Sequence, residues 1–325
     1  YGVEPSLLLC YFSPSLFSTV GIISGDESNL YFVASRYLLP TSLVLLTISI
    51  DLPGVMRLGP KAVTMFFTGT AGIVIGGPAA IWLVALVSPE TVGMGTDDVW
   101  RGLTTVAGSW IGGGANQTAM KEVFEVSDEV FGQLVAVDVI VANIWMAGLL
   151  WAAGRSKEID AKTGADASAI EHVREKVQEY RASISKIPTL TDTMTVLAVG
   201  FAVTAIAHAC ADFLAPFLME NAPQLQRFSL TSHFFWLIVI ATTMGLILSS
   251  RSEVRRLEGV GASRLGSAFL YVLVATIGMK MDLRSILDRP GLFAVGLVWI
   301  AIHAILLIGM ARIIKAPIFV LAVGS

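Results

Sequence analysis

One acidic residue stands inside an otherwise apolar stretch of this chain. Asp138 lies within residues 130–153, which also contain the amide side chain of Asn143. An ionised carboxylate at the centre of a membrane helix costs about 2.5–3.5 kcal/mol, so such a residue usually serves a purpose. A buried carboxylate can exchange a proton for a cation such as Na⁺. The alternative interpretation is a structural hydrogen bond to a neighbouring broken helix.

A run of three glycines, Gly112, Gly113 and Gly114, interrupts another apolar stretch. Each glycine costs about 1 kcal/mol relative to alanine inside a helix, so the helix is expected to break there. Unwound backbone at bilayer depth is tolerated only where it is buried in protein or lines a cavity. Four neighbouring side chains could replace the hydration shell of a solute or ion: Ser109, Asn116, Gln117 and Thr118. The competing interpretation is a close helix crossing built on small residues.

These two features predict a combined site for a coupling ion and a solute. Half-helix N-termini attract anionic groups, whereas half-helix C-termini and free carbonyls attract cations. The predicted Na⁺ or H⁺ site comprises Asp138, Asn116, Ser109 and Asn143. The predicted solute site comprises Gly112, Gly113, Gly114, Gln117, Thr118 and Ser325. No cofactor other than Na⁺ as a coupling ion is expected, and the sequence offers no convincing catalytic set, so an enzyme is not expected.

Composition places these residues in a membrane protein. Of the 325 residues, 54% are hydrophobic and 14% are charged, and the mean hydropathy is +0.73. Soluble domains carry about 25% charged residues, so we expect a multi-pass protein of the cell inner (plasma) membrane. Its expected partners are the lipid bilayer and a small-molecule solute, and no nucleic acid. The two cysteines, Cys10 and Cys210, lie in apolar stretches and indicate neither a disulfide framework nor a metal site.

Apolar stretches long enough to span a membrane recur along the chain. They cover 6–23, 30–50, 62–87, the interrupted 100–121, 130–153, 193–218, 234–248, 265–279 and 292–314, and another helix begins at 316. We therefore expect about ten crossings of the hydrocarbon core. The expected division is a first transmembrane repeat (1–153), a cytoplasmic linker (154–190) and a second repeat (191–325). Within the linker, apolar residues at helical spacing between 170 and 184 predict an amphipathic helix.

An internal repeat links the two halves. Aligning Asp51 with Asp282, an offset of 231 residues (282 minus 51), also brings Gly59-Pro60 opposite Pro290-Gly291. An apolar, glycine-bearing stretch follows in both halves, and Gly108-Ser109 then matches Gly324-Ser325. Internal repeats are typical of secondary transporters. We expect the natural protein to continue into a second interrupted helix.

The basic residues conflict with this simple count of crossings. Those of the linker, of residues 251–264, and Arg312 and Lys315 fall on one side, which should be cytoplasmic. Counting back from the linker places Arg57 and Lys61 on the other side and makes the repeats parallel. Both problems disappear if one crossing has been gained or lost between Lys61 and Arg155. They also disappear if segment 100–121 returns to the side from which it entered.

Over nearly its whole length the chain resembles the YjcL-like family of uncharacterised bacterial and plant membrane proteins. The segments that carry the resemblance are Tyr37-Leu38-Leu39-Pro40, Arg57-Leu58-Gly59-Pro60-Lys61-Ala62, Gly108-Ser109-Trp110-Ile111-Gly112-Gly113-Gly114-Ala115-Asn116, Val137-Asp138 and Asn143-Ile144-Trp145-Met146. That family is grouped with the cation:proton antiporter and anion transporter superfamily, which includes sodium/proton exchangers and bile acid:sodium symporters.

The resemblance implies an all-α polytopic fold of two inverted repeats, each of about five transmembrane helices. Discontinuous helices would cross at the bilayer centre, and the second of them is missing from this chain. A core domain would move against a panel or dimerisation domain, so a homodimer is one expected assembly. By the same resemblance, Asp138 is the ion-binding acid.

The leading functional prediction is therefore a secondary active transporter that works by alternating access. It would move a small anionic or zwitterionic solute coupled to Na⁺ or H⁺. One alternative is a monovalent cation/proton antiporter. A further alternative is a membrane protein without a transport function, either an enzyme or a scaffold.

Overall fold

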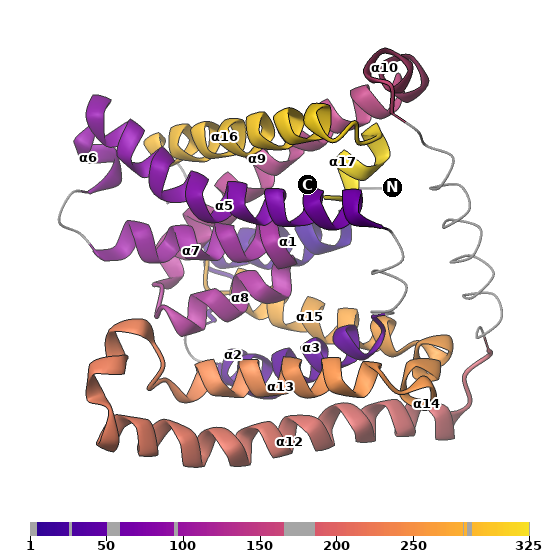
Figure 1. The fold of residues 1–325 in the computed structure, drawn as a ribbon. Helices are drawn as coiled ribbons and strands as arrows, with labels where there is room; N and C mark the ends of the chain where they lie inside the picture. The colour runs from indigo at the N-terminus through magenta and orange to yellow at the C-terminus, as the bar shows by residue number, and fades with distance from the viewer. Residues whose placement is uncertain are drawn as a thin grey trace.

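The computed structural model describes residues 5–25, 28–50, 59–93, 97–165, 186–281, 283–284 and 288–324. Within these residues the fold is entirely helical (Figure 1), which confirms the predicted all-α polytopic membrane protein. Asp51 and Asp282 of the repeat, the amphipathic stripe at 170–184 and Ser325 lie outside the described residues. Their predicted roles stay predictions.

Each apolar stretch expected from the sequence contains a helix. The helices are α1 (Pro5–Thr19), α2 (Leu30–Val33), η1 (Ala34–Leu38), α3 (Leu39–Ile48), α5 (Pro60–Val87), α6 (Pro89–Val92), α7 (Asp97–Gly112), α8 (Gly114–Val123), α9 (Asp128–Ala153), α10 (Ser156–Thr163), α12 (Leu190–Asn221), η2 (Pro223–Phe228), α13 (His233–Ser249), α14 (Ser252–Arg255), η3 (Arg256–Val260), α15 (Ala262–Gly278), α16 (Gly291–Ile313) and α17 (Ile318–Val323).

Five of the described helices are long and apolar enough to cross a membrane, fewer than the ten predicted. They are the continuous run Leu30–Ile48 and α5, α9, α12 and α16. Helix α13 is long enough to cross a membrane only if it is counted together with the segment Ser252–Val260. The two are bent by 102° relative to each other. Helix α15 is apolar but has 17 residues, and α1 has 15. At 1.5 Å per residue these two span about 22–26 Å, less than the usual hydrocarbon thickness.

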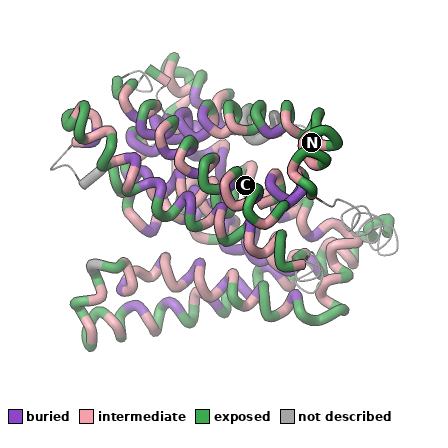
Figure 2. The backbone as a smooth tube through the Cα atoms, turned by 45° about the horizontal axis from the view of Figure 1, so that its top comes forward, coloured by how far each residue is buried: buried purple, intermediate pink, exposed green. Residues whose placement is uncertain are grey.

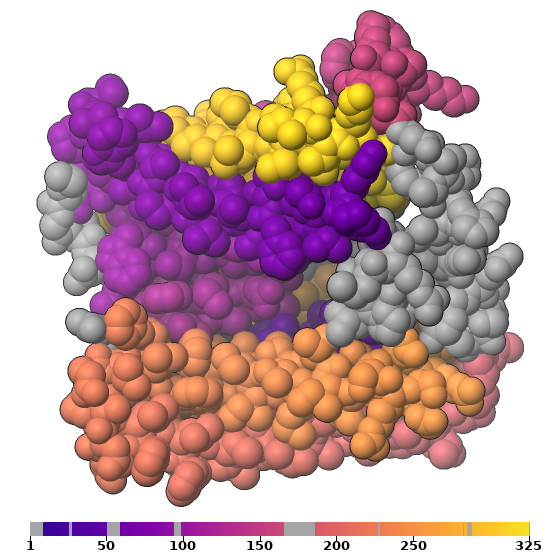
Figure 3. All heavy atoms as spheres, viewed as in Figure 1, coloured from indigo at the N-terminus to yellow at the C-terminus, as the bar shows by residue number. Residues whose placement is uncertain are grey.

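The helices form two bundles that each draw on both halves of the sequence. In the first bundle α3 packs against α12, α13 and α15, and α1 packs on α15. In the second, α5 packs against α16, and α7 against α8 and α9, while α9 also contacts α16. Buried residues follow the faces where helices meet (Figure 2). In the space-filling view α12 and α13 form a layer separate from α5 and α16 (Figure 3). The predicted division into two repeats and a linker stays a prediction.

Helices α5 and α16 run antiparallel through the second bundle. Lys61 at the start of α5 donates a hydrogen bond to the carbonyl of Lys315, just after α16, at 2.9 Å. Midway along, Gly72 lies against His303, where a Cβ on the glycine would come within 3.0 Å of the histidine ring. Gly72 and His303 differ by the same 231 residues as the repeat, as expected near a two-fold axis between inverted repeats. The repeat relation itself stays a prediction.

The interrupted segment is a hairpin and does not cross the membrane as a broken helix. Helices α7 and α8 meet at Gly113 and fold back on each other. The rings of Trp100, near the start of α7, and Phe124, just after α8, are 5.9 Å apart. Near the tip, a Cβ at Gly108 would contact the side chain of Met120. The predicted break is therefore present, but the predicted passage through the bilayer centre is not.

This hairpin removes the topological conflict. Because segment 97–123 returns to the side from which it entered, the start of α5 falls on the same side as the linker and Lys315. The contacts agree: Lys61 binds the Lys315 carbonyl, and Asp160 of α10 accepts a hydrogen bond from the Ile318 amide at 2.9 Å. By the positive-inside rule this shared side would be the cytoplasmic one, and that assignment stays a prediction. The opposite side then carries the open end of the hairpin.

Candidate functional site

The tip of the hairpin depends on one glycine conformation. Gly113 has φ 83° and ψ −178°, a left-handed backbone that side-chain-bearing residues rarely adopt. Its amide donates to the Ser109 carbonyl at 2.7 Å, which closes α7. Its carbonyl accepts from the amides of Asn116 and Gln117 at 3.0 and 3.1 Å, which opens α8. The glycine run therefore reverses the chain while satisfying the backbone on both sides of the break.

Asp138 lies against this tip and binds both arms of the hairpin. From α7, the Ser109 hydroxyl donates to Oδ2 at 2.7 Å and the Trp110 indole N–H donates to Oδ1 at 2.6 Å. From α8, the Gln117 amide donates to Oδ2 at 2.9 Å. Asp138 is 7% exposed and stands ten residues into α9. At 1.5 Å per residue this places it about 15 Å from the start of a helix that is long and apolar enough to cross a membrane.

The carboxylate of Asp138 has no basic partner among the residues that the structure describes. The donors that surround it are neutral, so its negative charge is solvated but not neutralised. An ionised carboxylate offers about four lone-pair positions, and the three hydrogen bonds leave one unused on Oδ1. A buried carboxylate in this condition has room for a proton or a small cation.

A second contact connects the site with the first bundle. The Tyr11 hydroxyl of α1 lies 3.4 Å from the Gln117 side-chain oxygen, and Tyr11 is 1% exposed. Helix α1 packs on α15, so this hydroxyl reaches the hairpin from the neighbouring bundle. On the other side, the Trp110 ring packs against Trp299 of α16 with centroids 5.0 Å apart. The acid is thereby held within a shell of aromatic and polar side chains.

The structure brings some of the predicted site residues together and separates others. Ser109 and Gln117 contact Asp138, and buried Thr118 donates to the Gly114 carbonyl at 3.0 Å. Asn116 instead lines a cavity between the hairpin and α5. Asn143 is exposed and donates to the Val139 carbonyl of its own helix at 2.7 Å.

The separation of Asn143 from Asp138 follows from helix geometry. Five residues rotate an α-helix by about 140° beyond a full turn, so the two side chains point to different faces. Two residues that the sequence prediction left without a role, Trp110 and Tyr11, do lie at the acid. Trp110 follows Ser109 directly in the quoted stretch, and its indole N–H is a donor that needs a partner when buried. Tyr11 carries no such local signal.

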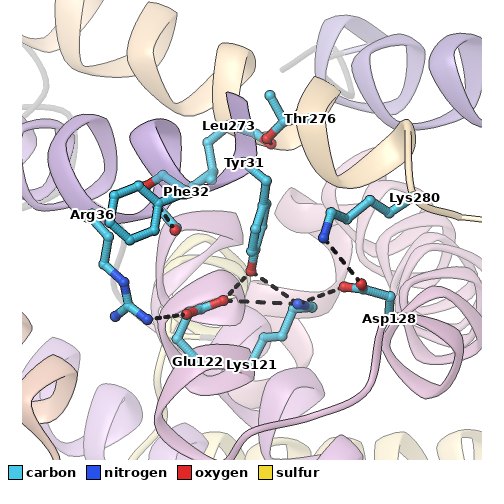
Figure 4. Close-up of polar contacts among 10 residues, drawn as sticks. Tyr31, Phe32, Arg36, Lys121, Glu122, Asp128, Leu273, Thr276 and Lys280 are labelled. Atoms are coloured by element: carbon cyan, nitrogen blue, oxygen red, sulfur yellow. Dashed lines mark hydrogen bonds and ion pairs between the residues drawn. The ribbon is translucent and has the colours of Figure 1, made fainter. Parts of the chain in front are cut away.

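A charged network lies at the open end of the hairpin (Figure 4). Lys121 of α8 is 5% exposed, pairs with Asp128 at 2.8 Å and donates to the Tyr31 hydroxyl at 3.0 Å. The Tyr31 hydroxyl donates in turn to Glu122. Two further pairs join the bundles: Arg36 with Glu122 at 3.2 Å and Lys280 with Asp128 at 3.6 Å. Here every charge has an opposite charge beside it, unlike Asp138.

Two cavities flank the hairpin. One, of about 310 Å³, is lined by Arg36, Lys121, Glu122, Glu125, Val126, Ser232, His233 and Phe234. The other, of about 570 Å³, lies between α5, α7, α8 and Trp299 and is almost entirely apolar, with Asn116 as its amide. No group of histidine, cysteine and acidic residues within the described ranges could hold a metal ion.

The histidines of α12 and α13 are occupied by structural contacts. Four-residue spacing makes His208 and Asp212 a plausible pair on one helix face, but each has a partner on another element. His208 binds the Arg36 carbonyl at 2.9 Å, and Asp212 binds His233 at 2.8 Å. These contacts tie α12 to η1 and α13.

Comparison with known proteins identifies a family without assigning an activity. A family model described as a protein of unknown function, DUF819, matches residues 1–325. The uncharacterised membrane protein YjcL of Bacillus subtilis (strain 168) is 24% identical over 300 residues, which cover 88% of this chain and 69% of that protein. No solved structure matches this chain. The similarity to a membrane protein agrees with the apolar helices described above.

Proposed function

Because this chain belongs to the DUF819 family of proteins of unknown function, and because that membership names no activity, we propose a function from the site itself. The protein is a secondary active transporter that moves a small solute coupled to Na⁺ or H⁺. The observation that carries this proposal is the buried carboxylate of Asp138, which both arms of a membrane hairpin solvate without neutralising it. Intramembrane acids of this kind mark ion and proton pathways.

The chemistry around Asp138 supports exchange of one cation. The Ser109 hydroxyl can donate to the carboxylate or accept toward a cation, since a hydroxyl has both capacities. The Oδ1 position left free by the three hydrogen bonds could accept a proton or contact Na⁺. Either occupant would neutralise the charge in a region where an uncompensated charge is costly. Binding and release would therefore change the electrostatics at the hairpin tip.

The two-bundle architecture supports alternating access. Helix α8 of the hairpin contacts α3 and α13 of the first bundle, so relative motion of the bundles would change the surroundings of the site. In transporters built from repeats, such rocking moves a fixed site between the two sides of the membrane. Because Tyr11 contacts Gln117 and Gln117 donates to Asp138, this motion would change the hydrogen bonds of the acid.

The first test measures ion-dependent stability of the full-length protein. Melting temperature is followed in detergent micelles against Na⁺, K⁺ and pH for the wild type and Asp138→Asn. We expect stabilisation by Na⁺ or by acid in the wild type and its loss in the variant. Asn143→Ala is the matched control, because this exposed amide hydrogen-bonds within its own helix, to the Val139 carbonyl, and not to Asp138. An unchanged ion response in Asp138→Asn would exclude this acid as the coupling site.

A transport assay separates the remaining alternatives. In liposomes, a cation/proton antiporter would dissipate a pH gradient when Na⁺ or K⁺ is added alone. A proton-coupled symporter would do so only with its solute present, whereas a sodium-coupled symporter would leave the pH gradient unchanged and take up labelled solute only when a Na⁺ gradient is imposed. Formation of a chemical product from a candidate solute would favour an enzyme instead. Location in the plasma membrane and assembly as a homodimer belong to the same proposal and are tested by fractionation and by mass measurement in micelles.

A further inference from the structure

The smaller cavity beside the hairpin lies where the two bundles meet. Arg36 of η1 and residues Ser232, His233 and Phe234 at the start of α13 form the wall from the first bundle. The end of α8 and the turn after it form the other wall. Its volume of about 310 Å³ is at the lower end of ligand cavities and suits a small solute. It lies beside the open end of the hairpin.

The walls of this cavity carry opposite charges. Arg36 supplies a guanidinium from one bundle, and Glu122 and Glu125 supply carboxylates from the other. The remaining ionisable groups already have acidic partners, Lys121 with Asp128 and His233 with Asp212. Glu125 is exposed and makes no ion pair with any residue that the structure describes. A solute with only one kind of charge would pair with one wall and would be repelled by the other.

The Arg36–Glu122 pair at 3.2 Å is the direct ionic contact across the cavity. It holds η1 against α8 (Figure 4). A molecule with a carboxylate and an ammonium group could take over both ends of this pair and also engage Glu125. Binding would then replace a contact between the bundles by two contacts to the solute. A ligand shifts a conformational equilibrium only by such a difference in contacts.

We propose that this cavity binds a small zwitterionic solute, with its carboxylate on Arg36 and its ammonium group on Glu122 and Glu125. This zwitterion would be the solute of the transporter proposed above. Only its transport depends on that proposed function. Binding is a property of the cavity and can be measured without transport. The large apolar cavity next to Asn116 lacks charged side chains in its lining and would not serve this solute class.

The test compares zwitterions with their singly charged halves. Neutral α-amino acids and small betaines at millimolar concentration are added to the purified full-length protein, and melting temperature is measured. Propionate and ethylamine, which are alanine without its ammonium and without its carboxylate, serve as matched probes. We expect at least one zwitterion to raise the melting temperature by a few degrees, and neither half to do so at the same concentration.

Two variants then locate the effect. Arg36→Gln should weaken the affinity for that zwitterion about tenfold or more, because loss of one partner in a charge pair weakens binding strongly. Glu125→Gln should weaken it less, and its fold is safe because Glu125 has no ion pair within the described chain. Lys162→Gln, which removes an exposed pair with Glu158 far from the cavity, is the control and should bind like the wild type.

The outcomes separate this proposal from the proposed function. The zwitterion proposal is supported if zwitterions still stabilise Asp138→Asn but stabilise both cavity variants less than the wild type. This holds even if no transport is found. The proposal is overturned if no zwitterion stabilises the wild type or if either singly charged half does so equally. It is also overturned if both Arg36→Gln and Glu125→Gln bind as the wild type does. If Arg36→Gln does not fold, Glu125→Gln alone decides.

Discussion

The two ends of the α7–α8 hairpin treat buried charge in opposite ways. At the closed end, Asp138 is surrounded by neutral donors and has no cation beside it within the described residues. At the open end, Lys121 is equally buried but pairs with Asp128 and contacts Tyr31. A paired charge holds helices together, whereas a charge that is solvated but not neutralised can accept a proton or cation. The comparison assigns exchange to one end and mechanical connection to the other.

The largest effect on stability is expected at the open end of the hairpin, where Lys121 and Asp128 are paired. Lys121→Met removes the buried cation of this network and leaves the partly exposed Asp128 with Lys280 as its remaining partner, which should cost about 2–3 kcal/mol of unfolding free energy. Asp138→Asn removes a charge that has no ionic partner and should cost far less. Denaturant unfolding in micelles measures both. Equal losses would mean that Asp138 is as structural as Lys121.

The next largest effect is expected in the Na⁺ response at the closed end of the hairpin, where Asp138 lies. Trp110→Phe keeps the ring beside Trp299 but removes the N–H donor to Asp138. A hydrogen bond to a charged group is worth about 1.5–3 kcal/mol. This bond is strongest while the carboxylate is unoccupied, so its loss favours the neutralised state, and we expect the Na⁺ concentration for half-maximal stabilisation to fall by up to about tenfold. An unchanged Na⁺ response would show that the indole only packs.

A smaller effect tests the hairpin tip. Gly113→Ala forces a side chain into a positive-φ extended conformation (φ 83°, ψ −178°) that essentially only glycine adopts, at a cost of about 1–3 kcal/mol. Gly309→Ala is the matched control, since it lies inside helix α16 with open space around it, where alanine should be neutral or stabilising. Thermal unfolding compares the two. A tip variant as stable as the control would contradict the role given to Gly113.

The smallest expected effect concerns the contact between the bundles at Tyr11. Tyr11→Phe removes a long hydrogen bond of 3.4 Å to Gln117, and we expect a loss of about 0.5 kcal/mol in stability. Its ion response should shift by no more than a fewfold, since the acid itself keeps its three donors. A shift as large as that of Trp110→Phe would make Tyr11 part of the ion site.

The sequence was most informative at residues whose presence in an apolar membrane helix costs free energy. Asp138 in an apolar span and three glycines in a row each carry a penalty that calls for a reason, so both were predicted to matter and both lie at one place in the structure. Ser109 and Gln117 could be predicted with them, because polar groups near a break must find partners. The five-residue spacing already turned Asn143 away from Asp138, but it did not decide whether Asn143 reaches the site from the flank. The place of Asn116 could not be predicted, because its orientation depends on how α8 packs against neighbouring helices.

The basic residues left two ways to repair the topology, a miscounted crossing or a reversal at the break, and the sequence could not choose between them. Glycine permits a continued crossing and a reversal equally, so the simple count included one crossing too many at this segment. The contacts between α7 and α8, such as that of Trp100 with Phe124, show the reversal. Tyr11 was invisible for a similar reason, since 106 residues separate it from Gln117.

By itself, the amino-acid sequence determined that this is a polytopic helical membrane protein with a broken segment and one expensive acid, because transfer of charge and of unpaired backbone into hydrocarbon is costly whatever the fold. The tertiary structure decided that the break is a hairpin, that its two arms share Asp138, and that Arg36 faces Glu122 across a cavity between two bundles. Those facts depend on which helices meet, and packing between distant segments, not local preference, settles that.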